Sequence, residues 1–174
     1  MVHIYHGDGK GKTTAAMGLA LRALGHGWRV LVVQFLKDGT SGEIRMLAGL
    51  PGVTVLHGEP GVKFTFQMTL EELAAERALA DARLARAAAA LDAGVDEAAQ
   101  LVVLDEVLDA LAAGTLSEAP LLELLRAHGE TAEIVLTGRG PSPELIYLAD
   151  YVTEMRCEKH PFERGEPARA GVEW

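Results

Sequence analysis

The 174-residue chain has one cysteine, only 5% aromatic residues, no long apolar run and no excess of positive charge. With Cys157 alone, an internal disulfide is excluded. No apolar run is long enough to cross a membrane and residues 1–4 lack the shape of a signal peptide, so we expect a cytoplasmic protein without membrane contact. The net charge of −9 argues against nucleic acid as the main partner, because binding a phosphate backbone requires a basic face.

The rest of the composition is that of a globular protein. Hydrophobic residues make up 49% of the chain and charged residues 24%, and 174 residues are enough to bury a sizeable core. No repeat or low-complexity linker divides the sequence, so we expect residues 1–174 to form a single domain. Residues 156–174 carry two prolines and charges of both signs, which predicts an irregular C-terminal tail.

A glycine-rich segment at the N-terminal end has the composition of a phosphate cradle. It reads Gly7-Asp8-Gly9-Lys10-Gly11-Lys12-Thr13-Thr14 and joins an apolar run to an Ala/Leu-rich amphipathic stretch. Glycines let backbone N–H groups point inward, and the N-terminus of the following helix adds partial positive charge. We expect Lys12 to reach the phosphates and the Thr13 hydroxyl to lie near a bound Mg²⁺. The usual P-loop motif has glycine where this chain has His6, but Gly-Lys-Thr in this setting still predicts binding of a nucleoside triphosphate.

Strand-like and helix-like segments alternate along the chain. The valine-rich run Arg29–Leu36 is apolar apart from Arg29 and Gln34, which is typical of a strand buried on both faces of a parallel sheet. The pattern therefore predicts a doubly wound α/β fold, with a mostly parallel sheet, helices on both faces and ligands at the carboxyl ends of the strands. The other expected strands are Val2–His6, Val53–His57, Leu101–Glu106, Glu133–Gly138 and Tyr151–Met155. The expected helices are Lys12–Leu24, Glu43–Leu50, a capping box at Thr69 with a helix to about Asp92, a helix from Ser117, and Pro143–Ala149.

Two acids, Asp105 and Glu106, follow the apolar residues 101–104. A carboxylate at the end of a buried strand can hold the Mg²⁺ that bridges phosphate oxygens, although acids also end strands for no catalytic reason. Which of the two contacts the metal stays open. Arg139 ends the next expected strand on the same edge, where it is either a triphosphate contact or an ordinary surface arginine.

The order and spacing of several segments resemble one family over essentially the whole chain, the P-loop ATP:corrinoid adenosyltransferases. The tail is the most discriminating part, because generic P-loop proteins lack it. The segments are residues 7–18 (GDGKGKTTAAMG), 32–37 (VVQFLK), 102–106 (VVLDE), 136–140 (LTGRG), 148–155 (LADYVTEM), 159–162 (KHPF), and Gly165, Ala168 and 171–174 (GVEW).

The resemblance implies that the cobalt of a reduced corrinoid attacks the 5′-carbon of ATP and releases triphosphate. Co(I) is itself a strong nucleophile, so the protein has to supply alignment and to stabilise charge on the triphosphate. Lys12 and Arg139 are then the candidate catalytic residues, with Mg²⁺ held by Thr13, Asp105 or Glu106. The resemblance also implies a homodimer, and a flavodoxin-like protein or a flavin as reductant.

Residues 61–66 (GVKFTF) resemble the family's loop below the corrin ring, where Phe-Thr-Trp is usual and Phe66 here replaces the tryptophan. The resemblance implies that Phe64 and Phe66 displace the lower cobalt ligand; the alternative is that they are ordinary loop anchors. Larger members carry a helical segment before the first strand. Since this sequence starts at the strand, we expect a partner subunit or the C-terminal tail to cover the corrinoid.

Two other functions use the same cradle: a small-molecule kinase or ATPase, and a non-catalytic protein that binds nucleotide or corrinoid. The product made from ATP separates the three, since it is triphosphate for the transferase, ADP for the kinase and neither for the binding protein. Whether the acceptor is a complete cobalamin or an earlier cobyrinic intermediate stays open.

Overall fold

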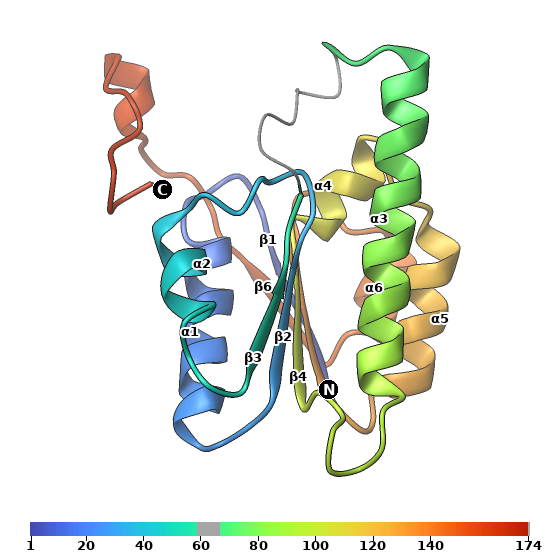
Figure 1. Ribbon diagram of the computed structural model, residues 1–174. Helices are drawn as coiled ribbons and strands as arrows, with labels where there is room; N and C mark the ends of the chain where they lie inside the picture. The colour runs from blue at the N-terminus through green and yellow to red at the C-terminus, as the bar shows by residue number, and fades with distance from the viewer. Residues whose placement is uncertain (59–66, 174) are drawn as a thin grey trace.

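The computed structural model describes residues 1–58 and 67–173, in which six parallel strands form one sheet in the order β3-β2-β4-β5-β1-β6 (Figure 1). The strands are β1 (Val2–His6), β2 (Val30–Gln34), β3 (Val53–Leu56), β4 (Leu101–Asp105), β5 (Glu133–Gly138) and β6 (Tyr151–Glu154). The helices are α1 (Lys12–Gly25), α2 (Gly42–Leu47), α3 (Leu70–Leu91), α4 (Val107–Ala112), α5 (Glu118–His128), α6 (Pro143–Leu148) and the 3-10 helix η2 (Pro161–Arg164). None of these helices has the length and apolar character needed to cross a bilayer.

Helices cover both faces of the sheet, which confirms the doubly wound α/β fold. Figure 1 shows α1 and α2 on one side of the strands and α3, α5 and α6 on the other. On the first side the small residues Ala16 and Ala20 of α1 pack on β2 and β4 within one apolar cluster. On the second side Ala80 and Leu84 of α3 belong to a separate, larger cluster. Because both faces are covered, β2 and β4 are buried along their whole length.

The capping box expected at the start of α3 is present. The Thr69 side chain accepts a hydrogen bond from the Glu72 backbone N–H at 3.2 Å, and the Glu72 carboxylate accepts one from the Thr69 N–H at 2.9 Å. Two of the backbone donors left unpaired at a helix start are satisfied in this way.

The end of β4 differs from the expectation in a way that matters for the site. The strand stops at Asp105, and Glu106 is in the left-handed region with φ 60° as the N-cap of α4. Helix α4 was not predicted, because six residues are too few to show a helical period. The tail also departs from an irregular chain, since η2 forms within it.

The strand order brings distant segments together at the carboxyl edge of the sheet. β5 lies between β1 and β4. His6 of β1 is in register with Gly138 of β5, and Gln34 of β2 is in register with Asp105 of β4. The glycine-rich loop after β1, Thr137 near the end of β5 and Asp105 at the end of β4 therefore lie next to one another.

Candidate functional site

The glycines of the loop after β1 are required by a close approach of the chain that follows β6. The Gly9 N–H donates to the Met155 carbonyl at 2.7 Å. A Cβ on Gly7 or Gly9 would overlap the backbone of Met155, and at Gly9 that of Arg156 as well. Gly7 also has φ 111°, which side chains rarely adopt. The glycines thus stand where the fold needs them, while His6, at the position of the usual motif's first glycine, belongs to strand β1.

Lys12, the first residue of α1, folds back over this loop. Its ammonium donates to the carbonyls of Gly7 at 2.7 Å and Gly9 at 2.9 Å. Burial lowers the pKa of Lys12, and the positive charge of Arg139 lowers it further. Within the described residues, the hydrogen bonds of this ammonium go only to neutral backbone carbonyls, which an anionic ligand can replace.

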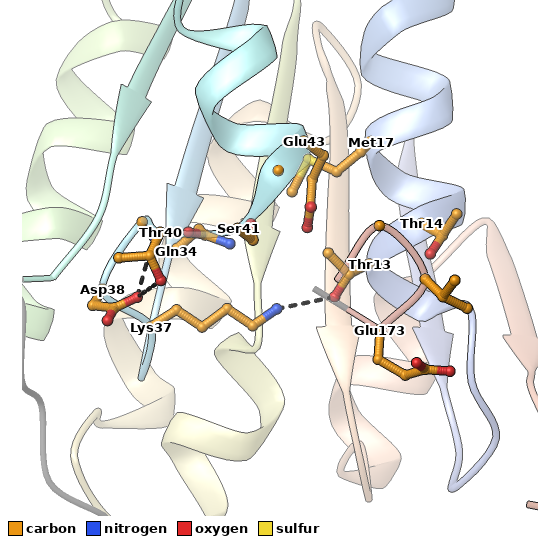
Figure 2. A pocket seen from close by; sticks show the side chains of 14 residues that line it. Thr13, Thr14, Met17, Gln34, Lys37, Asp38, Thr40, Ser41, Glu43 and Glu173 are labelled. Carbon is orange, nitrogen blue, oxygen red and sulfur yellow. Dashed lines mark hydrogen bonds between the residues drawn. The ribbon is translucent and has the colours of Figure 1, made fainter. Parts of the chain in front are cut away.

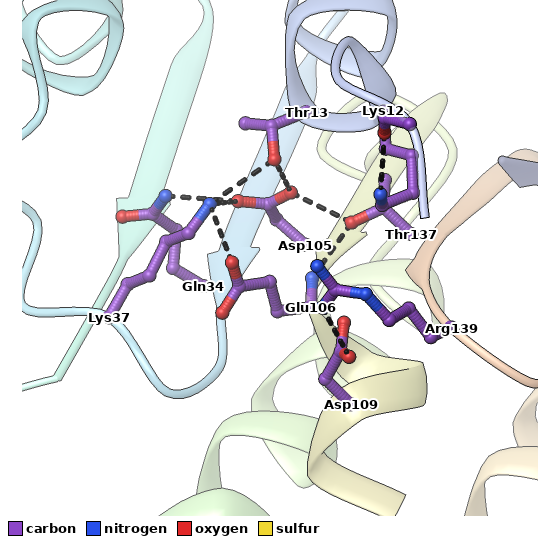
Figure 3. A network of polar contacts seen from close by, with 10 residues as sticks. Lys12, Thr13, Gln34, Lys37, Asp105, Glu106, Asp109, Thr137 and Arg139 are labelled. Carbon is purple, nitrogen blue, oxygen red and sulfur yellow. Dashed lines mark hydrogen bonds and ion pairs between the residues drawn. The ribbon is translucent and has the colours of Figure 1, made fainter. Parts of the chain in front are cut away.

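Asp105 is the centre of the polar network in Figure 3. Its side chain is fully buried, so its charge depends on the donors around it. Oδ1 accepts from the hydroxyls of Thr13 and Thr137, each at 2.8 Å. Oδ2 accepts from the Gln34 amide at 3.1 Å and the Lys37 ammonium at 2.8 Å. Four donors from four elements or loops thus fix one carboxylate.

Lys37 bridges the two acids predicted to bind metal. Its Nζ lies 3.2 Å from Glu106 Oε1 as well as 2.8 Å from Asp105. Burial lowers the pKa of Lys37, but the two carboxylates together outweigh burial and the net shift is upward. For Glu106 burial raises the pKa most, the Lys37 charge opposes it, and the neighbouring Asp105 charge adds to the rise. Desolvation is therefore the larger influence on Glu106.

Arg139 follows β5 and lies on the side of the network away from Lys37 (Figure 3). Its Nη1 is 3.1 Å from Asp109 Oδ1, and 63% of its side chain is exposed. Gly138, with φ 139°, allows the chain to pass against Asp109, because a Cβ there would overlap that side chain. Arg139 thus borders the cradle with its guanidinium open to solvent.

Two adjoining cavities open on these groups. One of about 330 Å³ is lined by residues 8–14, Lys37, Glu106 and Arg139. The second, of about 590 Å³, lies between Thr13 and Met17 of α1, Gln34 of β2 and residues 37–43 (Figure 2). Among the described residues, two buried side-chain polar atoms have no hydrogen-bond partner, Gln34 Oε1 and Ser41 Oγ, and both residues line this second cavity. The second cavity thus offers an acceptor and a hydroxyl to a ligand.

The C-terminal tail forms a wall shared by both cavities. Residues Val172 and Glu173 line each of them. Arg169 holds the Glu173 carboxylate at 3.0 Å, and hydrogen bonds from Arg169 lower the pKa of Glu173 to about 2. The tail therefore places a fixed negative charge beside the cradle.

The structure brings together the predicted residues of the glycine loop with Thr13, Asp105, Glu106 and Arg139. Phe64 and Phe66 lie outside the described residues. Sequence reasoning missed Lys37, Gln34, Thr137 and Asp109 as parts of the site. A polar Gln34 inside an otherwise apolar strand was the available signal, because a buried polar residue needs a partner.

A metal would not find a complete set of protein ligands here. Within residues 1–58 and 67–173, no group of three or more His, Cys, Asp or Glu side chains could hold an ion. Thr13, Asp105 and Glu106 supply oxygen atoms only, and too few to fill a coordination shell. That donor set suits Mg²⁺, which keeps several waters and takes further oxygens from a substrate's phosphates.

Comparison with known proteins gives consistent matches. The family model for "ATP:corrinoid adenosyltransferase BtuR/CobO/CobP" matches residues 1–174. A corrinoid adenosyltransferase of Pseudomonas aeruginosa is 40% identical over 173 residues, covering 98% of this chain and 82% of that protein. Corrinoid adenosyltransferase CobA of Salmonella typhimurium is 35% identical over 182 residues, covering 100% of this chain and 85% of its own length.

Among solved structures, ATPases 2 and 3 of EssC from Geobacillus thermodenitrificans superpose with a TM-score of 0.54 at 12% identity. The match covers 99% of this chain but only 36% of that longer chain. At this identity the likeness concerns the fold alone.

Proposed function

Because this chain belongs to the ATP:corrinoid adenosyltransferase family, we propose a role in that reaction for each part of the site described above. The protein is a corrinoid adenosyltransferase, which transfers the 5′-deoxyadenosyl group of ATP to the cobalt of a reduced corrinoid. A cobalt–carbon bond forms, the bond between C5′ and the α-phosphate oxygen breaks, and its electron pair leaves with triphosphate. The family thus favours this function over the kinase and the non-catalytic binding protein.

The glycine cradle is the proposed site of the triphosphate. The leaving group gains negative charge as the C5′–O bond breaks, so fixed donors that face it lower the barrier. Backbone N–H groups of residues 10–12 and the Lys12 ammonium supply such donors, while the Gly9 N–H holds the loop through the Met155 carbonyl. Lys12 exchanges its contacts with the Gly7 and Gly9 carbonyls for phosphate oxygens, and Arg139 borders the same cavity.

Thr13, Asp105 and Glu106 are the proposed residues that hold Mg²⁺. The position suits a cation, because the Lys37 ammonium already lies within 3.2 Å of an oxygen of each of these residues. A bound Mg²⁺ would neutralise charge on the triphosphate. Thr137 and Gln34 orient Asp105 through hydrogen bonds, so they act as positioning residues.

The cavity of about 590 Å³ is the proposed site of the nucleoside. It adjoins the cradle through Thr13 and Thr14, so a ligand that extends beyond the phosphates enters it. Gln34 Oε1 accepts a hydrogen bond from a ribose hydroxyl or the adenine amine, since its amide nitrogen is committed to Asp105. The placement of the corrin ring over Phe64 and Phe66 stays a proposal from the sequence.

A homodimer is also proposed, with the edge strand β6 as a surface available for contact. Tyr151 and Val152 on that strand are 51% and 42% exposed. A cytoplasmic location and reduction of the corrinoid by a flavodoxin-like protein or a flavin rest on the sequence and the family.

The observation that carries the proposal is the cluster of Thr13, Asp105 and Lys37, which contact one another beside the glycine loop. To test it, the protein is incubated with ATP, Mg²⁺ and chemically reduced cobalamin. We expect the absorbance spectrum of adenosylcobalamin and one triphosphate for each corrinoid converted. Release of ADP, or an unchanged spectrum with intact ATP, would contradict the assignment.

A further inference from the structure

Lys37 contacts all three residues proposed to hold the metal. Its Nζ is 2.8 Å from Asp105 Oδ2, 3.2 Å from Glu106 Oε1 and 3.2 Å from the Thr13 hydroxyl. One ammonium thus occupies the position at which the oxygen atoms of these residues converge (Figure 3).

We propose that Lys37 is an internal cation that holds the metal position in the nucleotide-free protein and makes metal binding depend on polyphosphate. The ammonium and a divalent cation cannot occupy the same oxygen cluster, so the metal binds only when Lys37 leaves. This inference rests on the metal site proposed above and adds a role for a residue outside that ligand set.

The charges around Lys37 explain the dependence. If a metal enters alone, Lys37 loses two carboxylate partners and stays near a dication, which repels it. If polyphosphate enters with the metal, the displaced ammonium finds phosphate oxygens as new partners. Lys37 lines both cavities and its side chain is 27% exposed, so it is placed to move from the carboxylates toward a ligand.

The backbone beside Lys37 is in a conformation that needs support. Leu36 has φ 53°, in the left-handed region that a leucine rarely adopts, and Gly39 has φ 74°. Strained positions of this kind persist where neighbouring contacts hold them and occur where segments change conformation. The ion pairs of Lys37 are contacts of that sort, so their release frees the segment between β2 and α2.

Lys37 is not needed to satisfy Asp105. Three other donors remain on this buried carboxylate when the lysine is removed, namely Thr13, Gln34 and Thr137. A purely structural role would therefore make Lys37→Met neutral or harmful for metal binding. The internal-cation role predicts the opposite sign, which makes the two distinguishable.

The test measures Mn²⁺ binding to the nucleotide-free protein, from the paramagnetic resonance signal of free Mn²⁺. We expect Lys37→Met to bind Mn²⁺ at least tenfold more tightly than the unmodified protein, and Lys37→Gln to do the same. Lys159→Met, which removes an exposed lysine of the tail, is the matched control and should change nothing. Adding Asp105→Asn to Lys37→Met should abolish the gain, which locates it at this site.

Inorganic triphosphate then tests the coupling. In the unmodified protein the Mn²⁺–triphosphate complex should bind far more tightly than Mn²⁺ alone. In Lys37→Met this ratio should fall at least tenfold, since the metal no longer competes with the ammonium and the complex has lost one cationic contact.

A folded Lys37→Met or Lys37→Gln that binds Mn²⁺ no more tightly than the unmodified protein overturns the inference, as does an unchanged ratio. These measurements use neither ATP nor corrinoid, so such a result leaves adenosyl transfer standing. Conversely, absence of transfer in the unmodified protein overturns the proposed function and not the role of Lys37.

Discussion

Replacing Thr137 by valine should weaken the fold and the metal site together, because one buried hydroxyl connects them. Thr137 is 1% exposed, and its Oγ1 donates to Asp105 Oδ1 and accepts from the Glu106 N–H, both at 2.8 Å. Valine keeps the shape of the side chain and removes both bonds.

The expected loss follows from the two partners. A hydrogen bond to a charged group contributes about 1.5–3 kcal/mol, and a buried N–H left unpaired costs about 1–3 kcal/mol. Asp105 keeps three other donors, so we take the lower part of the summed range, about 3 kcal/mol in the free energy of unfolding. For a domain of this size each kcal/mol shifts Tm by about 2–4 °C, so Tm should fall by roughly 6–12 °C.

Thermal unfolding followed by circular dichroism measures this loss, and a Mg²⁺ titration of adenosyl transfer measures its effect on the site. The Mg²⁺ concentration for half-maximal rate should rise about 10–100-fold, the usual cost of losing a residue that orients a metal ligand. Thr137→Ser is the matched control, since it keeps the hydroxyl and loses about 1 kcal/mol with one methyl group. A valine variant that melts within 2 °C of the unmodified protein, or a serine variant as impaired as valine, would refute the role of the hydroxyl.

Three further changes test other parts of the site. Lys12→Ala should lower the rate of adenosyl transfer by about 10²–10³, because it removes a charged donor to the leaving triphosphate; more than half of the original rate would contradict the cradle assignment. Gly9→Ala should lower both Tm and ATP affinity, because its Cβ would overlap the backbone of Met155 and Arg156. Gly18→Ala is the control, since Gly18 lies in open space on α1, and it should stabilise the folded protein by about 0.5–1 kcal/mol. Equal Tm changes in the two variants would contradict the packing argument. Glu106→Gln should lose activity. Its free energy of unfolding, compared with that of the unmodified protein at the same pH, should become larger as pH rises. Burial raises the pKa of Glu106 in the folded state, so the stability from its protonation is full below the ordinary value of 4.5 and is lost as pH rises through the folded pKa. Urea unfolding near pH 4 and near pH 7 checks the sign, and a variant relatively less stable at the higher pH would show that ionised Glu106 is net stabilising.

The sequence predicted most of the fold, because its strands are strongly patterned. β1 and β5 match their expected bounds at both ends, and α3 begins directly after the predicted capping residue Thr69. The expected β2 was longer than the observed strand, Val30–Gln34, because the apolar pattern continues to Leu36, where the backbone turns into the left-handed region with φ 53°. Helix α4 escaped prediction because a short helix lacks a readable period.

The parts of the site that consist of neighbouring residues in the sequence were predictable. The parts that depend on the order of strands in the sheet were not. The Gly-Lys-Thr motif identified the cradle, and two acids after an apolar strand identified the carboxylates. Thr137 joins them only because β5 lies between β1 and β4, which no local pattern reveals. Lys37 reaches Asp105 from the segment that follows the adjacent strand β2, so its role likewise depends on which strands are neighbours.

The place of β1 in the sheet has a consequence for synthesis of the protein. In the described structure β1 pairs only with β5 and β6, so residues 7–132 must be translated before its first partner begins. At about 5–20 residues per second, that interval is roughly 6–25 s, during which β1 has no strand to pair with. The glycine loop is translated early but gains its fixed conformation late, since the Gly9 N–H needs the Met155 carbonyl as its partner. Capture of nucleotide by a nascent chain would therefore report that translation has passed residue 155.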